Sequence, residues 1–193
     1  MSVFNENYWT SRYQQGQTQW DAGAITTPLK TYFDQLEDRS LRILIPGGGS
    51  GWEAEYLHRQ GFTQVYLLDL SAIPLQKFQE RNPDFPAQHL LQADFFALEG
   101  QWDLIVEQTF FCALHPSQRP AYARQAARLL KPGGKLVGVL FNVPLNSEHP
   151  PFGGEEQEYR AYFEPHFSHV SISSCYNSIK PRAGREVWIR MVR

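Results

Sequence analysis

The sequence has few cysteines, no long apolar run and no excess of charge of either sign. Cys112 and Cys175 are far apart and form no CxxC or Cys/His spacing, so neither a disulfide framework nor a zinc site is predicted. The 18 basic and 20 acidic residues give a formal net charge of −2, which offers no basic surface to nucleic acid or to an acidic membrane. We therefore expect no metal, no nucleic-acid partner and no membrane partner.

Membrane and export signals are also missing. No stretch approaches the roughly 18 apolar residues of a membrane span, and residues 1–10 are polar and aromatic, without the apolar core of a signal peptide. We expect a cytoplasmic protein. We also expect it to be a monomer or a weak homodimer. The chain is rich in hydrophobic residues, which make up 42% of its 193 residues. This is enough for one sizeable hydrophobic core in a single domain.

Strand and helix patterns alternate after about residue 40. Short apolar runs that end at glycine or polar residues are typical of strands buried on both faces. Only a short polar connection, residues 176–185, separates the last two apolar runs, and this favours an antiparallel hairpin there. The pattern predicts an α/β fold with a mostly parallel seven-stranded sheet and helices on both faces. Strands are expected at 41–46, 65–70, 89–92, 102–107, 135–141, 170–175 and 186–192, and helices at 51–60, 71–81, 117–130 and 155–163.

The boundaries of these elements are predicted from caps and turns. Ser71 and Ser117 are expected to cap helices, and residues 131–134 (KPGG) predict a turn. Residues 1–38 precede the first strand and read as helical, with Thr27 as the cap of a helix that starts at Pro28. We divide the domain into an N-terminal helical segment, 1–38, and a doubly wound core, 39–193.

A glycine-rich loop joins the first strand to the helix that follows it. Glycine there allows a sharp turn and a close approach of the backbone to a ligand, which open α/β sheets bind at the carboxyl ends of their strands. The spacing matches the GxGxG form of this loop found in methyltransferases. The residues of the loop are Gly47, Gly48, Gly49, Ser50 and Gly51.

The dinucleotide pattern GxGxxG fits this loop less well. Counted from Gly47, its third position falls on Trp52; counted from Gly49, it falls on Ala54, which is a tolerated variant. A nicotinamide cofactor therefore stays an alternative at this point.

Polar residues follow the other strands at the same edge. Asp69 ends the second strand, where a carboxylate can accept hydrogen bonds from both hydroxyls of a ribose; the alternative is a helix-capping Asp beside Ser71. Asp94 is placed to bind an adenine amino group, and Phe95 is placed to cover the adenine ring. The alternative is that Asp94 is an ordinary loop residue and Phe95 an ordinary core residue. Phe110 follows the fourth strand and is either a pocket residue or plain core.

Together these residues resemble the thiopurine S-methyltransferase family, nearest to its bacterial members and to the plant thiol and halide methyltransferases. The resemblance runs from about residue 8 to residue 167. The first and fifth segments below are specific to the family, and the others recur widely among methyltransferases. They are Trp9-x-x-x-Tyr13-x-x-Gly16-x-Thr18-x-Trp20-Asp21-x-Gly23, Pro46-Gly47-x-Gly49-x-Gly51, Leu68-Asp69-Leu70-Ser71, Asp94-Phe95-Phe96, Phe110-Phe111-Cys112-Ala113-Leu114 and Leu129-Leu130-Lys131-Pro132-Gly133-Gly134.

The resemblance implies a Rossmann-like class I methyltransferase that uses S-adenosylmethionine and releases S-adenosylhomocysteine. It implies transfer of the methyl group to a small nucleophile, a thiol or other sulfur acceptor or a halide, under an N-terminal lid. Family members often carry His-Gly-Gly-Pro-Pro after the fifth strand, whereas residues 148–154 read EHPPFGG, so the loop that shapes the acceptor pocket is expected to be shorter or rearranged. The implied cofactor contacts are Trp9, Tyr13, Trp20, Gly47, Gly48, Gly49, Gly51, Asp69, Leu70, Ala93, Asp94, Phe95 and Gln108, and the substrate-pocket candidates are Trp20, Phe110 and Phe152.

No general base is required for such a reaction. In-line attack on an activated methyl group chiefly needs positioning and a dry site, so no catalytic residue is assigned. Trp9 and Tyr13 would share a helix face and could stabilise the sulfonium cation, or could simply pack the helix onto the sheet. Weaker candidates, read as structural, buried or solvated residues, are Asp21, Cys112, His115, His149, Arg182 and Arg185. For Arg182 and Arg185 the alternative is that the tip of their loop reaches the acceptor pocket.

Three alternatives remain beside this interpretation. A nicotinamide-dependent oxidoreductase would share the fold, but no Tyr/Lys or His partner for hydride transfer stands out. A cofactor-binding protein that has lost catalysis would share the site. A nucleic-acid methyltransferase is disfavoured by the acidic balance of charge.

Overall fold

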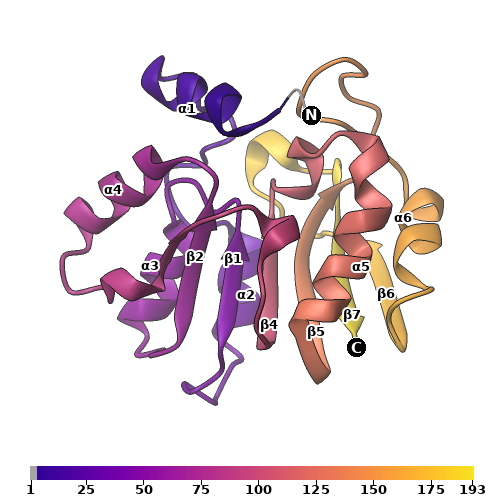
Figure 1. The fold of residues 1–193 in the computed structure, drawn as a ribbon. Coiled ribbons are helices and arrows are strands. Elements are labelled where there is room, and N and C mark those ends of the chain that lie inside the picture. Colours follow the sequence, from indigo (N-terminus) through magenta and orange to yellow (C-terminus); the bar gives the residue numbers. More distant parts are fainter. Residues whose placement is uncertain (1–3) are drawn as a thin grey trace.

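The computed structural model describes residues 4–193, and its strands form one seven-stranded sheet (Figure 1). The strands are β1 (Ile43–Pro46), β2 (Val65–Asp69), β3 (Leu90–Gln92), β4 (Trp102–Gln108), β5 (Leu130–Phe141), β6 (His169–Ser174) and β7 (Glu186–Val192). Their order is β3-β2-β1-β4-β5-β7-β6. β1 to β5 pair in parallel, and β7 pairs antiparallel with both β5 and β6. The predicted sheet with its antiparallel C-terminal hairpin is confirmed.

Helices cover both faces of this sheet. The helices are α1 (Glu6–Gln14), α2 (Thr27–Phe33), α3 (Trp52–Arg59), α4 (Ala72–Arg81), α5 (Arg119–Leu129) and α6 (Glu156–Phe163), with short 3₁₀ turns η1 (Ala87–His89), η2 (Phe95–Ala97), η3 (Phe111–Ala113), η4 (Pro116–Gln118) and η5 (Lys180–Arg182). Because side chains alternate between the faces of a strand, Ile43 and Ile45 of β1 pack in a cluster with α2, α3 and α4, while Leu44 packs in a second cluster with α5 and α6. Among the described residues, no helix has the length and apolarity needed to span a bilayer.

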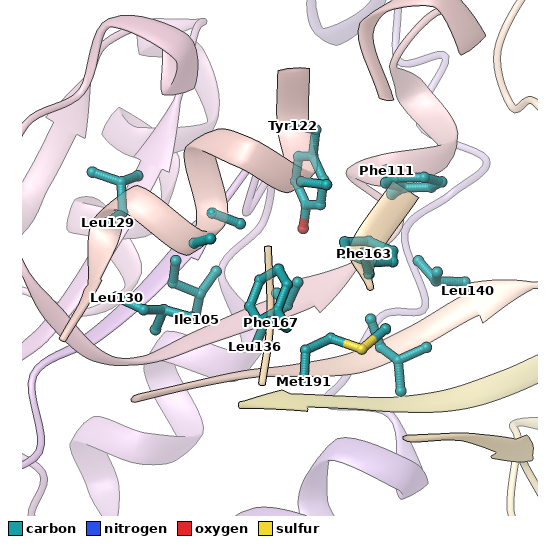
Figure 2. Close-up of a cluster of buried hydrophobic side chains, with 14 of the residues drawn as sticks. Ile105, Phe111, Tyr122, Leu129, Leu130, Leu136, Leu140, Phe163, Phe167 and Met191 are labelled. Carbon is teal, nitrogen blue, oxygen red and sulfur yellow. The ribbon is translucent and has the colours of Figure 1, made fainter. Parts of the chain in front are cut away.

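Aromatic side chains fill the space under α5 and α6 (Figure 2). The rings of Phe111 and Tyr122 meet edge to face at 5.2 Å between centroids, and Phe111 lies 5.9 Å from Phe163. Met191 of β7 and Leu136 of β5 lie beneath them in the same cluster. This packed layer leaves room for a ligand at the ends of the strands and not between the helices and the sheet.

Two predicted helix starts shift in the structure. Thr26, not Thr27, is the N-cap of α2, and its hydroxyl donates to Oε1 of Gln108 at 2.9 Å instead of capping the helix. Ser117 does not cap α5. A turn of 3₁₀ helix, capped by the His115 side chain, precedes α5, which begins at Arg119.

The predicted turn at residues 131–134 is wrong. These residues belong to β5 as an irregular part of the strand. Trp102 pairs with Leu130 and Leu104 pairs with Lys135, so the register of β4 with β5 shifts between the two pairs. Gly133, with φ of 77°, takes up the extra length because a left-handed conformation is accessible to glycine.

The N-terminal helix α1 lies at the end of the sheet toward which the parallel strands point (Figure 1). None of its residues is fully buried. Polar contacts attach it: Thr10 Oγ1 donates to Ser71 Oγ at 2.8 Å, and Gln92 Nε2 donates to Glu6 at 3.2 Å. The segment therefore sits over the carboxyl ends of β2 and β3.

Candidate active site

The glycine loop is forced into its shape by close packing. Gly47 and Gly49 have φ of 58° and 52°, in the left-handed region that disfavours other residues. A Cβ on Gly47 would lie 2.3 Å from the ring of Phe110, whereas one on Gly49 would face Tyr13 Oη at 3.3 Å. The loop thus passes directly beneath the N-terminal segment and against the residue that follows β4.

Asp69 is the buried acid of the site. It is 5% exposed, and its Oδ2 accepts hydrogen bonds from the Gly49 N–H at 3.1 Å and from the Tyr13 hydroxyl at 3.3 Å. Oδ1 accepts from the Ser71 N–H at 2.9 Å. Burial raises the pKa of Asp69 to about 6, although these donors favour the ionised form. The carboxylate is therefore oriented by the loop and by α4 and is ionised at neutral pH.

A cavity of about 520 Å³ opens beside this carboxylate, within the size range of small-molecule sites. Residues of α1 and β2, together with residues that directly follow β1 and β4, form much of its wall. It gathers most of the residues that the sequence predicted. Those that line it are Trp9, Tyr13, Trp20, Gly47, Asp69, Leu70, Ala93, Asp94, Phe95 and Phe110.

A smaller cavity of about 40 Å³ lies on the other side of the glycine loop. Gly48, Gly49 and Gln108 line this cavity, not the larger one. Oε1 of Gln108 accepts from Thr26, but its Nε2 is buried with no hydrogen-bond acceptor among the described residues. The predicted cofactor residues are therefore divided between two neighbouring cavities.

Two predicted residues lie outside both cavities. Gly51, in the left-handed conformation, is the N-cap of α3 and packs against Phe78 and Leu67. Phe152 is 2% exposed, and its N–H donates to the Cys112 carbonyl at 2.7 Å. The neighbouring Pro150 and Pro151 line the large cavity, and Phe152 packs behind them.

Asp94 and Phe95 sit on the far wall of the large cavity. The exposed Asp94 carboxylate accepts from the Phe96 N–H at 2.9 Å, which starts the turn η2. Phe95 is buried, with its ring 5.3 Å from Tyr122 in a stacked arrangement and 5.4 Å from Phe110. Phe95 thus belongs to the core and to the cavity wall at once.

Three aromatic rings of the N-terminal segment meet above the cavity. The rings of Trp9 and Trp20 are 5.6 Å apart, and those of Tyr13 and Trp20 are 5.7 Å apart, both edge to face. Burial and the nearby Asp69 raise the pKa of Tyr13, so its hydroxyl stays a neutral donor. Such a group of aromatic faces suits a cationic ligand.

Glu107 shapes the turn after β4 from inside the core. Its Oε1 accepts from the N–H groups of Phe110 and Phe111 at 2.9 and 2.8 Å, and its Oε2 accepts from the Tyr122 hydroxyl at 2.6 Å. Burial raises the pKa of Glu107 to about 7. The bonds hold a turn in which Thr109 has φ of 59°, and they set Phe110 against Gly47.

Two residues that the sequence named only as weak candidates, Asp21 and Arg182, lie at the site. Arg182 is 8% exposed and lines both cavities, so its interpretation as a solvated loop charge is wrong and the alternative, a loop that reaches the pocket, agrees with the structure. Its NH2 donates to the Trp20 carbonyl at 2.7 Å. Asp21 accepts from Ser50 Oγ at 2.5 Å and from Trp52 Nε1 at 2.7 Å, and so ties the N-terminal segment to the glycine loop. No local pattern marks either contact, because each joins residues distant in sequence.

The remaining weak candidates behave as structural groups. Burial raises the pKa of the Cys112 thiol to about 12, which keeps it neutral and confirms its interpretation as a small buried side chain. Arg185 is exposed, as expected. His115 caps η4. Among residues 4–193, no group of three His, Cys, Asp or Glu side chains could hold a metal ion.

The loop, the buried acid and the aromatic group fit an adenosine-bearing sulfonium cofactor. The model of the thiopurine S-methyltransferase family matches residues 4–189. The chain belongs to the thiopurine S-methyltransferase family. It is therefore an S-adenosylmethionine-dependent methyltransferase that yields S-adenosylhomocysteine. This assignment decides against the nicotinamide oxidoreductase.

Plant relatives cover nearly the whole chain. "Probable thiol methyltransferase 2" of Arabidopsis thaliana is 31% identical over 192 residues, which cover 96% of this chain and 84% of the relative. Thiocyanate methyltransferase 1 of Brassica oleracea is 31% identical and covers 94% of this chain and 82% of its own length.

A solved structure shares the fold. The 1,6-didemethyltoxoflavin-N1-methyltransferase of Burkholderia thailandensis, with bound S-adenosylhomocysteine, superposes with a TM-score of 0.75 at 18% identity. The match covers 97% of this chain and 86% of the other. It confirms the class I methyltransferase fold.

Proposed function

We propose that this methyltransferase acts on the sulfur atom of a small thiol or thiolate-like anion, or on a halide, bound in the 520 Å³ cavity. The observation that carries the proposal is the wall around the turn after β4. Of its residues only Cys112 has an ionisable side chain, and burial raises the pKa of that thiol to about 12. The wall consists of Thr109, Phe110, Cys112, Ala113, Leu114, Phe141, Pro150 and Pro151.

Such a wall favours an acceptor that needs no deprotonation by the enzyme. Thiolates and other soft anions are already nucleophilic near neutral pH, whereas alcohols and ammonium groups must first lose a proton. The names of the plant relatives, a thiol and a thiocyanate methyltransferase, support the same class.

The cofactor-binding residues have separate tasks in this proposal. Asp69 accepts hydrogen bonds from the ribose hydroxyls, and Asp94 and Phe95 bind the adenine. When bound, the cofactor supplies a methyl group activated by a sulfonium cation. Trp9 and Tyr13 exclude water from that cation and stabilise it by about 0.5–2 kcal/mol.

We also infer that residues 1–38 act as a lid, of which residues 1–3 lie outside the described part. Thr10 and Tyr13 attach it to the end of β2, and Asp21 attaches it to the glycine loop. We further propose a small-molecule acceptor and a cytoplasmic enzyme that is a monomer or a weak homodimer. The net charge of −2 supports the first point, because it offers no basic surface to nucleic acid.

A methyl-transfer assay over a panel of nucleophiles tests the acceptor class, with S-adenosylhomocysteine production as the measurement. The panel contains hydrosulfide, thiocyanate, iodide, small aliphatic thiols and a thiopurine, with a catechol and a primary amine as controls. We expect the highest kcat/KM for a sulfur compound or halide, and no turnover of the catechol or the amine. A higher kcat/KM for either control compound would refute the proposal.

A further inference from the structure

Residues 15–26 connect α1 to α2 and carry the aromatic side chain against which α1 packs. This side chain is Trp20, whose ring meets the rings of Trp9 and Tyr13 edge to face. Both of these residues belong to α1, which has no fully buried residue of its own. The position of α1 over the large cavity therefore depends on where Trp20 is held.

Asp21, the next residue after Trp20, fixes this connecting segment to the glycine loop and to α3. Its Oδ2 accepts from the Ser50 hydroxyl at 2.5 Å, and its Oδ1 accepts from the Gly23 N–H and from the Trp52 ring N–H, each at 2.7 Å. Burial alone would raise the pKa of Asp21, but these donors lower it below its ordinary value. The carboxylate is thus ionised, and groups of the chain itself occupy both of its oxygens.

The two residues that donate to Asp21 across this contact are themselves held by α4. The guanidinium of Arg81 lies over the Trp52 ring, 4.2 Å from its centroid, and its NH2 group donates to the Ser50 carbonyl at 2.5 Å. Its Nε donates to the buried Glu55 at 2.6 Å. Asp21 is therefore bound to a site whose own geometry is fixed by a third element.

The rest of the connecting segment makes few contacts that could replace those of Asp21. Residues 22–24 are exposed. The Trp20 carbonyl accepts from Arg182 at 2.7 Å, and Thr26, at the far end, donates to Gln108 at 2.9 Å. Loss of the Asp21 carboxylate would therefore free the part of the segment that carries the Trp20 ring.

We propose that Asp21 is a positioning residue for cofactor binding. By fixing its segment to the glycine loop it holds Trp20 in place, and Trp20 in turn holds α1 over the cavity. Asp21 acts without touching the cofactor: it raises the population of the closed lid, and the apparent affinity rises with that population. The inference rests on the lid proposed above and is independent of the acceptor.

Calorimetric affinities for S-adenosylhomocysteine give the first test. We expect Asp21→Ala to weaken binding about tenfold, and Asp21→Asn, which keeps one acceptor oxygen, to lie between this variant and the wild type. Trp52→Phe removes one donor and keeps an aromatic ring, so it should weaken binding about threefold and covers the case in which Asp21→Ala does not fold. Wild-type affinity in the folded Asp21 and Trp52 variants would refute the inference.

A double-mutant cycle with Trp20→Ala shows whether Asp21 acts through Trp20. If it does, adding Asp21→Ala to Trp20→Ala should change the affinity for S-adenosylhomocysteine by less than about twofold, because the ring that Asp21 positions is already gone. Losses that multiply in the double variant would show that Asp21 acts by another route.

Amide hydrogen exchange measures the lid directly. S-adenosylhomocysteine should slow exchange in α1 of the wild type, and this protection should be lost in Asp21→Ala while α5 stays protected. If the ligand did not slow exchange in α1 of the wild type, the lid proposal and this inference would both fail. If it slowed exchange equally in Asp21→Ala, this inference alone would fail.

Asp38→Ala is the matched control. Asp38 also accepts from the N–H group two residues ahead, that of Ser40, at 2.8 Å, but it is exposed and lies outside the site. This variant should keep the wild-type affinity and the wild-type exchange of α1. A failure of the sulfur-acceptor proposal would leave all of these measurements unchanged.

Discussion

Asp69 combines deep burial with three hydrogen-bond donors, and these two influences act on its pKa in opposite directions. Burial disfavours the charged carboxylate, whereas the N–H groups of Gly49 and Ser71 and the Tyr13 hydroxyl favour it. Burial is the stronger effect, so the pKa rises to about 6. The group therefore titrates just below the physiological range, at the position proposed for the ribose.

We expect cofactor affinity to depend on pH through Asp69. The ionised carboxylate accepts hydrogen bonds from ribose hydroxyls and the protonated one accepts them poorly. The affinity for S-adenosylhomocysteine should thus be constant above about pH 7 and decrease as the pH falls below about 6. Titration calorimetry between pH 5 and pH 8 measures this directly.

The variant Asp69→Asn tests whether the pH dependence of cofactor affinity comes from Asp69. It should bind S-adenosylhomocysteine about ten- to a hundredfold more weakly at pH 8, the equivalent of about 1.5–3 kcal/mol for hydrogen bonds to a charged group. Its remaining affinity should change less between pH 5 and pH 8 than that of the wild type. Asp38→Asn, at an exposed aspartate outside the site, is the control. A wild-type affinity that stays flat down to pH 5 would contradict the assigned role.

The helix α1 shows how an element with little core of its own is held in place. A helix of nine residues is marginal in water, and α1 has no fully buried residue to anchor it. It is attached through Thr10, Tyr13 and the ring of Trp9 against Trp20. Removing one of these contacts should therefore affect the ligand site more than the stability of the core.

For Trp9→Ala we expect a loss of affinity that depends on the charge of the ligand. Binding of the sulfonium cofactor S-adenosylmethionine should weaken about 2- to 30-fold, which corresponds to about 0.5–2 kcal/mol of cation–π stabilisation. Binding of the uncharged thioether S-adenosylhomocysteine should weaken less. Calorimetry with both ligands gives the comparison.

Tyr176→Ala serves as the control for this variant, because Tyr176 is 88% exposed. The thermal midpoint of Trp9→Ala should stay close to that of the wild type. If a folded Trp9→Ala protein bound S-adenosylmethionine as tightly as the wild type, Trp9 would have only a packing role.

At the scale of the whole molecule, ligand binding and folding are linked. A ligand that binds only the folded state at about 100 times its Kd stabilises it by about 2.7 kcal/mol. For a chain of this size, each kcal/mol raises the midpoint by about 2–4 °C. We expect S-adenosylhomocysteine to raise the thermal midpoint by about 5–11 °C in scanning calorimetry, and NAD to leave it unchanged. An equal rise with NAD would contradict the preference of this site for the methyl-donor cofactor.

Much of the fold followed from short stretches of sequence. Apolar runs between glycine and polar residues predicted the strands to within one or two residues, except at β5, and Ser71 was confirmed as the cap of α4. The glycine loop and Asp69 were found in the same way. All of these features depend on neighbouring residues, through steric limits on the backbone and the alternation of side chains along a strand.

Contacts between distant residues could not be predicted from such patterns. Arg182 reaches the Trp20 carbonyl, Glu53 faces a cavity and Phe152 packs behind one. The position of β7 between β5 and β6 also depends on contacts between distant residues. The sequence by itself determined the elements, the glycine loop and the acid that follows β2, because these are local. Only the tertiary structure decided which side chains share a cavity, because that depends on how separate elements pack.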